Sequence, residues 1–405
     1  MPLIGDAESG SLPPKSPSTV DLIWLQWRGK PKTVEVIVMP SASQKDLRCF
    51  ILLELVMEGP IAMADRIDRR CFLARGVVGA AAAGAVHSSI EEKTLAAAID
   101  DGSAQPAAPA APKTDIPPGS LPCGKIGNVA VSRLMIGGNL IGGWAHSRDL
   151  AYASKLFTSY NTEAKVFETL ELAQACGINT IQLDPQCWGV VAKYNATRNP
   201  KIQTMVCIPV AADKAQATEA IKKQIDMGAT FIYSHGGDTD NFMMKGGSID
   251  AIAQMVDLIK AQGVPAGVGG HSLNMPQACE QAKVNNDFYV KTFHMDRYWS
   301  ATPQDQREEY DWMRGNSDHN KNNDNMWCNN PDETAAFMKT VEKPWVAFKV
   351  MAAGAISPRV AFPNAFRNGA DFVIAGMFDF QVEEDVKIAI DSVQKCETRD
   401  RRWMA

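Results

Sequence analysis

The stretch Ala229-Thr230-Phe231-Ile232-Tyr233-Ser234-His235-Gly236-Gly237 decides the fold of this chain. It is a short apolar run with Phe231, Tyr233 and His235 on one side, and it ends in two glycines. This pattern predicts a β-strand that runs into a glycine-rich turn and holds the His235 imidazole at its carboxyl end.

Similar strands recur along the chain. Apolar runs of about five to seven residues alternate with amphipathic helical stretches, which indicates βα units and a parallel sheet. The expected strands are 133–137, 179–183, 202–208, 230–234, 265–269, 287–292, 345–350 and 371–376. Eight such strands predict a closed (β/α)8 barrel, also called a TIM barrel. No GxGxxG motif follows the first strand, which disfavours an open dinucleotide-binding sheet.

Composition and length are consistent with one large barrel. The chain has 405 residues, of which 45% are hydrophobic, and a formal net charge of −5. A barrel needs about 250 residues, so extensions are expected. The mild acidity argues against nucleic-acid binding, and no apolar run in the mature part reaches the about 18 residues of a membrane span. The 9 cysteines include no CxxC pair, which excludes a zinc ribbon.

Residues 63–99 have the features of an export signal in the usual order. Arg69-Arg70 precede Phe72-Leu73 and then a small apolar stretch rich in alanine. This order resembles a bacterial twin-arginine signal. The resemblance implies recognition by the twin-arginine export machinery and a periplasmic location.

The segments around this signal differ from the expected barrel. Residues 1–62 have scattered prolines and no sustained period, so we interpret them as a disordered upstream extension of the gene, with Met63 as the true start. Residues 100–122 are rich in proline and alanine, which predicts a flexible linker. The barrel then occupies residues 123–405.

Three of the six histidines follow adjacent expected strands, and Asp184 ends another. Carboxyl ends of barrel strands meet at one mouth, where barrel active sites lie. We therefore expect His235, His271 and His294 to bind a divalent metal, with Asp184 as a possible fourth ligand or proton carrier. Zinc or manganese suits such a nitrogen and oxygen set. The alternative for each histidine is an ordinary hydrogen-bonding or substrate-contacting role.

Two lysines are the second candidate group. We expect Phe288 and Val290 to face the helices, so that Lys291 faces the barrel interior, and the same alternation turns Lys349 inward. A buried lysine needs a carboxylate partner or a chemical role. The strings V-K-T, F-K-V-M-A-A-G-A-I and A-D-F-V-I-A-G-M resemble strands 6 to 8 of class I aldolases. That resemblance implies a Schiff base on Lys291, tuned by a second lysine.

The start of the barrel has a further resemblance. G-K-I-G-N-V-A-V-S-R-L-M-I-G-G-N, then A-Q-A-C-G-I-N-T-I-Q-L-D, resembles the opening of aldo/keto reductases. Asp184 matches that family's aspartate, but Trp188 stands where its catalytic tyrosine is expected, and the strand 202–208 has no lysine. The resemblance therefore implies barrel ancestry, and NADP is not expected as a cofactor.

Two connections are too long to be simple links, residues 137–161 and 295–330. Loops longer than about 15 residues in a compact domain are usually lids, binding loops or disordered segments. Aromatic residues bordered by Asn, Asp and Arg suit a sugar-like substrate, although they could instead pack the loops onto the barrel rim. The expected substrate-binding residues are Asn139, Trp144, His146, Tyr298, Trp299 and Asp379.

Together these patterns predict an exported barrel enzyme for a small polar, carbohydrate-like substrate. The expected chemistry is a metal-assisted isomerase, lyase or hydrolase reaction, in which Asp184, Lys291 or Lys349 moves a proton. The alternatives are a Schiff-base aldolase, an oxidoreductase related to aldo/keto reductases, and a barrel that binds sugars without catalysis. The sequence does not predict an oligomeric state.

Overall fold

The structure, a computed structural model, describes residues 27–29, 32–34, 112–146, 150, 152–310 and 326–405. The chain divides into two compact units, Met1–Ala108 and Pro109–Ala405. In the first unit, β1 (Trp27–Gly29) pairs antiparallel with β2 (Lys32–Val34). The predicted signal at 63–99 and the start at Met63 lie outside the described residues.

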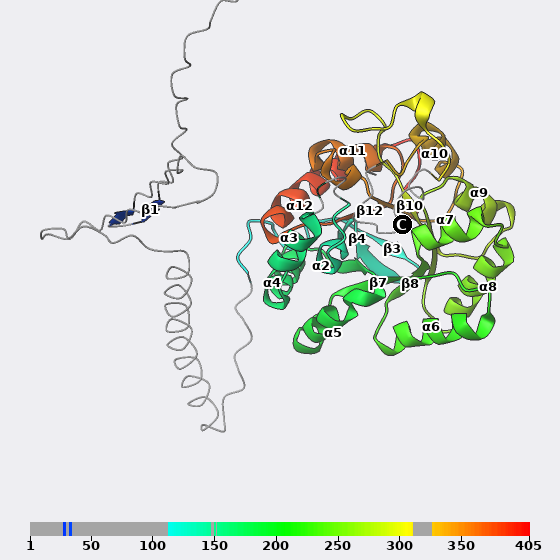
Figure 1. The fold of residues 1–405 in the computed structure, drawn as a ribbon, viewed down its shortest axis with the longest axis horizontal. Helices are drawn as coiled ribbons and strands as arrows, with labels where there is room; N and C mark the ends of the chain where they lie inside the picture. Colours follow the sequence, from blue (N-terminus) through cyan, green and yellow to red (C-terminus); the bar gives the residue numbers. More distant parts are fainter. Residues whose placement is uncertain (1–26, 30–31, 35–111, 147–149, 151, 311–325) are drawn as a thin grey trace, which may run out of the picture. The chain divides into compact units, whose positions relative to one another are not determined.

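The second unit contains the predicted barrel. Eight parallel strands close on themselves in chain order, with the last strand pairing to the first (Figure 1). They are β5 (Leu134–Gly137), β6 (Thr180–Leu183), β7 (Gln203–Ile208), β8 (Phe231–Ser234), β9 (Ala266–Gly270), β10 (Phe288–Thr292), β11 (Trp345–Phe348) and β12 (Phe372–Ala375). Every strand overlaps one of the eight predicted from sequence, so the (β/α)8 prediction is confirmed.

Helices surround the barrel, as the amphipathic stretches predicted (Figure 1). Those that follow the strands in turn are α4 (Glu163–Ala175), α5 (Trp188–Thr197), α6 (Lys214–Asp226), α8 (Ile249–Lys260), α9 (Asn274–Gln281), α10 (Pro331–Met338), α11 (Pro358–Arg367) and α12 (Asp379–Gln394). Three short additions lie between a strand and its outer helix, namely α2 (Asn139–Gly142), α3 (Ala153–Tyr160) and α7 (Gly236–Met244). The predicted loop 137–161 therefore contains two helices.

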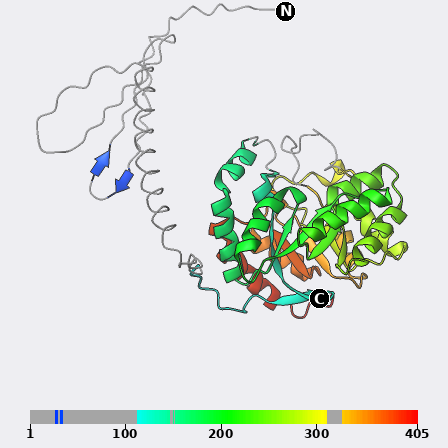
Figure 2. The same cartoon turned by 90° about the horizontal axis from the view of Figure 1, so that it is seen from below.

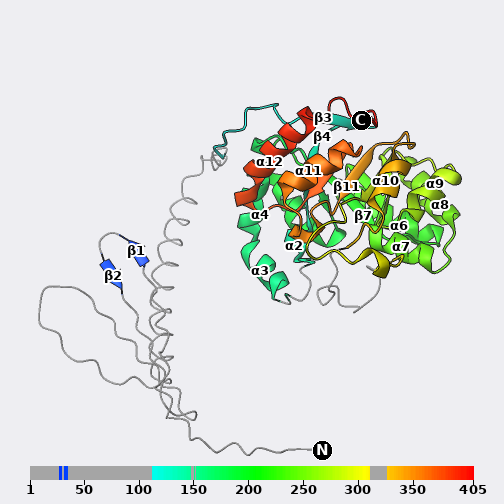
Figure 3. The same ribbon diagram turned by 90° about the horizontal axis from the view of Figure 1, so that it is seen from above.

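One end of the barrel is closed by a hairpin. β3 (Cys123–Ile126) and β4 (Val129–Ser132) pair antiparallel, and they lie at the same end of the barrel as the C-terminus (Figure 2). Ile126 and Val131 of this hairpin join the cluster of side chains that fills the barrel interior. Figure 3 shows α2 and α3 at the opposite end. That opposite end, which we call the carboxyl mouth, is where strands β5 to β12 terminate.

Alternation along the strands separates two buried layers. The interior cluster contains Met135, Met205, Cys207, Phe231, Tyr233, Phe288, Val290, Val346, Phe372 and Ile374. The intervening residues, such as Tyr289, Trp345 and Ala347, pack with the surrounding helices.

This layering corrects one prediction. Phe288 and Val290 face the interior, so Lys291 faces the helices, and Lys349 lies beyond the end of β11. Both faces of a barrel strand are buried and apolar, so alternation alone does not tell inside from outside.

Within the described ranges, none of the helices is long and apolar enough to cross a membrane.

Candidate functional site

The interior just below the carboxyl mouth has a polar group of side chains. Gln182 donates a hydrogen bond from Nε2 to the Tyr233 hydroxyl at 2.9 Å, so Gln182 faces inward. Asp184 follows β6 and accepts from the Gln186 backbone N at 2.9 Å, and its Oδ2 lies 3.9 Å from the Cys207 sulfur. Burial raises the pKa of both Tyr233 and Cys207 well above their ordinary values, so both are protonated at neutral pH.

A buried Asp–His pair lies on the rim of the mouth. Asp240 of α7 is fully buried, and its Oδ2 lies 2.8 Å from His271 Nδ1. The same oxygen accepts from the His271 backbone N at 2.7 Å, and Oδ1 accepts from the Ser272 backbone N at 3.2 Å. A carboxylate beside Nδ1 fixes the tautomer with the proton on Nδ1 and the lone pair on Nε2. This is the arrangement by which a carboxylate orients a general base.

A second group of side chains on the rim comes from three different segments of the chain. The Lys349 ammonium, just after β11, lies 3.0 Å from His146 Nε2, and Asn139 Nδ2 lies 3.2 Å from the same nitrogen. The ammonium also lies over the Trp327 ring, 4.2 Å from its centroid. His146 and Lys349 both have positive φ, +47° and +56°. Positive φ is uncommon for residues other than glycine and tends to occur at functional sites.

Phe348 connects these two groups. Its ring centroid lies 5.2 Å from that of His271 and 6.0 Å from the Lys349 ammonium. A Cβ on Gly236 would lie 3.3 Å from both His271 Cε1 and Phe348 Cζ, so the glycine allows this close packing. The Asp240–His271 pair and the Lys349–His146 group therefore share one sector of the rim.

His294 does not act as a metal ligand in this arrangement. Its Nδ1 donates to the Met295 carbonyl at 2.9 Å, and its Nε2 accepts from the backbone N of Trp327 and of Cys328, each at 3.0 Å. Both ring nitrogens are thus used to hold the connection that follows β10. Burial lowers the pKa of His294 to about 4, so the ring is neutral at physiological pH.

The predicted histidine metal centre is therefore corrected. His235 caps α7, accepting from the Asp238 backbone N at 3.2 Å, and its Nδ1 lies 2.9 Å from Asp238 Oδ2. Over the part of the chain that the structure describes, no group of three His, Cys, Asp or Glu side chains could hold a metal ion. The three histidines follow adjacent strands, but each is directed to a different local partner.

Lys291 is fully buried behind the barrel wall. Its ammonium donates to the Thr292 carbonyl at 2.8 Å, and its Cα pairs with that of Gly270 on β9. Because the side chain faces the helices, a Schiff base with a substrate at the mouth is not accessible to it.

The predicted substrate-binding residues separate into different environments. Asn139 and His146 lie in the Lys349 group, and Trp144 packs against the hydrophobic core. The Tyr298 hydroxyl lies 3.2 Å from the Met326 sulfur, whereas Trp299 is 81% exposed.

Asp379 has a structural environment. Its carboxylate accepts from the Tyr160 hydroxyl at 2.6 Å and from Lys165 at 3.1 Å. It therefore joins the start of α12 to α3 and α4.

Sequence reasoning missed two residues of the site. Asp240 stands five residues after His235, inside a helix, where alternation along a strand gives no information. Acidic residues at the start of a helix could have indicated Asp240, as in the run Gly236-Gly237-Asp238-Thr239-Asp240. Trp327 belongs to the long connection after β10, and its packing under Lys349 depends on tertiary contacts alone.

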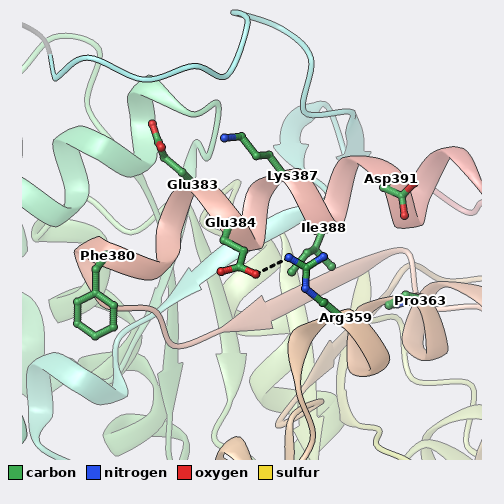
Figure 4. A pocket seen from close by; sticks show the side chains of 8 residues that line it. All are labelled: Arg359, Pro363, Phe380, Glu383, Glu384, Lys387, Ile388 and Asp391. Atoms are coloured by element: carbon green, nitrogen blue, oxygen red, sulfur yellow. Dashed lines mark hydrogen bonds and ion pairs between the residues drawn. The ribbon is translucent and has the colours of Figure 1, made fainter.

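Two surface grooves lie away from the mouth. One, of about 670 Å³, runs between α11 and α12, where the Arg359–Glu384 ion pair spans it (Figure 4). The other, of about 610 Å³, lies beside Met404 and Ala405 at the hairpin end. Neither is lined by a residue that the sequence predicted for the site.

The fold defines the chain as a (β/α)8 barrel protein, and solved structures share this fold. A proposed aldo-keto reductase from Pseudomona aeruginosa matches with 14% identity and a TM-score of 0.46, over 67% of this chain and 94% of that one. Mandelate oxidase matches with 11% identity and a TM-score of 0.39, over 69% and 77%. A flavocytochrome b2 variant matches with 10% identity and a TM-score of 0.40, over 69% and 68%.

These neighbours include the reductase family that the start of the barrel resembles. At such identities the likeness concerns the fold alone. No protein-family model matches the chain. No curated protein matches it either.

Proposed function

We propose that the chain is an enzyme that acts on a small polar, carbohydrate-like substrate. It removes a proton from the carbon atom next to a carbonyl group and returns a proton to the substrate. The reaction class is that of an isomerase or lyase. The observation that carries this proposal is the fully buried Asp240 carboxylate, 2.8 Å from His271 Nδ1 at the barrel mouth.

His271 is the proposed general base. A histidine whose Nδ1 proton is directed to a carboxylate presents Nε2 as the basic nitrogen, and Asp240 stabilises the imidazolium that forms. General-base catalysis by such a group contributes about 10²- to 10⁴-fold in rate.

Lys349 is the proposed electrophile. An ammonium directed at a carbonyl oxygen stabilises the negative charge that develops when the neighbouring carbon loses a proton. His146 and Trp327 hold this ammonium in place through the contacts at 3.0 and 4.2 Å. Asp184, at the end of β6, is the proposed second proton carrier.

This proposal replaces metal assistance with proton transfer between side chains. The metal route needs three histidines to converge, and they have separate partners. The Schiff-base route through Lys291 needs a reactive amine at the mouth, and the Lys291 side chain lies on the other side of the wall. The remaining alternative is a barrel that binds sugars without catalysis. In that case the protein would bind a sugar but would not exchange the sugar's hydrogen with solvent.

Export is a further part of the proposal. The order of features around Arg69-Arg70 supports a twin-arginine precursor whose barrel acts in the periplasm. Replacing both arginines by lysine should retain the protein in the cytoplasm, as judged by fractionation and immunoblotting. Unchanged periplasmic recovery would contradict this assignment.

The test of the reaction is hydrogen exchange with solvent. Full-length protein is incubated in D2O with a panel of aldoses, ketoses and hydroxy-ketones, and loss of the proton next to the carbonyl is followed by proton NMR. We expect exchange with at least one compound, and a loss of about 10²- to 10⁴-fold in His271→Gln. Asp257→Asn, an exposed carboxylate change on α8, should exchange at the wild-type rate. Equal exchange by wild type and His271→Gln would refute the proposal.

A further inference from the structure

Lys291 is a buried cation that the proposed reaction does not use. Its side chain is fully buried, and its ammonium has one hydrogen bond, to the Thr292 carbonyl at 2.8 Å. Burying an ammonium is costly unless other charges or a function compensate for it. Its presence in the layer between the barrel wall and the helices therefore needs an explanation.

The strand pairing places this cation beside the Asp–His pair. β10 pairs with β9 so that the Lys291 Cα is opposite Gly270, the residue before His271. Asp240 of α7 accepts from the backbone N of His271 and of Ser272, the two residues that follow β9. Asp240 and Lys291 are thus a carboxylate and an ammonium, both fully buried, that come from different elements to the carboxyl end of β9.

Other charged and titratable groups around Lys291 come from the connection after β10. They are His294, Cys328 and Glu309, of which Glu309 accepts from the Ser272 hydroxyl. Burial lowers the pKa of the Lys291 ammonium, and Cys328, Asp240 and Glu309 oppose that effect. Of the groups named, the fully buried Asp240 is the one that also binds His271.

We propose that Lys291 is a positioning residue for the Asp240–His271 pair. The ammonium behind the strand keeps Asp240 ionised and His271 neutral, so that the imidazole is ready to accept a proton. The role in catalysis rests on the function proposed above, whereas the effect on protonation does not require a substrate.

The positive charge of Lys291 acts on the Asp240–His271 pair in a known direction. A nearby positive charge disfavours protonation of both the carboxylate and the imidazole. Removing the charge should therefore raise the pKa of His271, because the imidazolium is no longer repelled. We expect an increase of about one pH unit, which is about tenfold in proton affinity. A lysine that only fills space would leave this pKa unchanged when methionine replaces it.

The experiment is an NMR titration of the histidine rings in the full-length protein labelled with ¹⁵N-histidine. The His271 signal is assigned by its loss in His271→Gln, and it is followed in wild type, Lys291→Met and Lys291→Gln. The control is Lys343→Met, since Lys343 contacts Glu280 and Asn286, which lie before β10. We expect the upward shift in both Lys291 variants and none in the control.

A reciprocal measurement covers the case in which neither Lys291 variant folds. Coupling between two sites is mutual, so Asp240→Asn should lower the pKa of Lys291 in protein labelled with ¹³C at lysine Cε. Unchanged or lowered His271 pKa in the Lys291 variants overturns the inference, as does an unchanged Lys291 pKa in Asp240→Asn. A shifted His271 pKa without any substrate exchange would contradict the proposed function and leave the positioning role supported.

Discussion

The Asp240 carboxylate accepts from the His271 backbone N at 2.7 Å and lies 2.8 Å from the Nδ1 of the same residue. One fully buried side chain thus fixes both the main chain and the ring of His271. The ring orientation is set by α7, which directly follows β8, and by the end of β9. Two adjacent βα units therefore have to form before this base is oriented.

Lys349 should matter for the reaction more than for stability. Its side chain is half-buried, and the contacts of its ammonium include a histidine nitrogen and the rings of Trp327 and Phe348. Lys349→Met should reduce the exchange rate by about 10²- to 10³-fold, as expected when a group that stabilises developing charge is removed. The urea unfolding free energy should change by about 1 kcal/mol or less, because a cation–π contact has that size. An unfolding change of several kcal/mol with normal exchange would show a structural role instead.

His294 should make the protein lose stability in mild acid. Burial lowers its folded-state pKa to about 4 from an ordinary value of 6.5. Below pH 6.5 the unfolded chain binds a proton that the folded protein does not, so stability falls as the pH decreases toward 4. The loss amounts to about 3 kcal/mol at most. Urea unfolding of wild type and His294→Gln between pH 7.5 and pH 4 measures it.

The variant has two expected effects with different pH dependence. At pH 7.5, His294→Gln should be less stable by about 1 to 3 kcal/mol, because the flexible glutamine amide cannot reproduce all the hydrogen bonds that the ring makes with Trp327 N, Cys328 N and Met295 O. Its stability should then fall less steeply than that of wild type as the pH decreases. A parallel pH dependence in both proteins would contradict the neutral, doubly bound state of His294.

Asp385 should have the opposite pH dependence. Its side chain is 2% exposed, and its Oδ2 has no hydrogen-bond partner among the described residues. Burial, with Glu384 nearby, raises its pKa to about 7 from 3.8. The folded protein therefore keeps a proton that the unfolded chain releases, and stability is lost as the pH rises from 3.8 to 7.

Asp385→Asn removes this titration and should stabilise the protein at pH 8. The gain should be at most about 4 kcal/mol and should vanish near pH 4, where both states are protonated. Asp391→Asn serves as a control on the same helix, because its side chain is 55% exposed and pairs with Lys395. Equal unfolding free energies for wild type and Asp385→Asn at pH 8 would show that the carboxyl group finds a partner in solution.

The arginines near the C-terminus should be essential for the stability of the barrel end that the hairpin closes. Asp371 is fully buried and pairs with Arg399 at 2.8 Å and with Arg401 at 2.7 Å. Arg401 also donates to the backbone carbonyls of Met338, Val341, Lys343 and Gly369. Breaking a buried ion pair from one side costs about 3 to 5 kcal/mol. Arg401→Met should therefore lower the unfolding free energy by that amount, whereas Arg402→Met at an exposed pair should change it little.

The sequence predicted the barrel because its signal is repeated. Eight apolar runs separated by amphipathic stretches allow few other folds, and an error in one run would not change the result. The boundaries were also close, since the carboxyl ends of β5, β6, β7, β8 and β10 lie where the apolar runs end. Local patterns are sufficient for this level of structure.

The site was predicted less well because it depends on the direction in which individual side chains point. Val346 and Phe348 alternate with Trp345 and Ala347, and all four are apolar, so nothing in the strand identifies the interior face. The inward direction of Lys291 was wrong for this reason. His294 lies beyond its strand, and its backbone partners come from residues more than 30 positions later. Such partners are fixed by tertiary packing and leave no periodic signal.

The most direct test of the account is a double-mutant cycle on hydrogen exchange with solvent, using His271→Gln, Asp240→Asn and the double variant. If Asp240 acts through His271, each single variant should lose exchange, and the double variant should be no slower than His271→Gln alone. Losses that simply multiply, or a single variant that exchanges at the wild-type rate, would contradict the claim that these two residues form one catalytic unit.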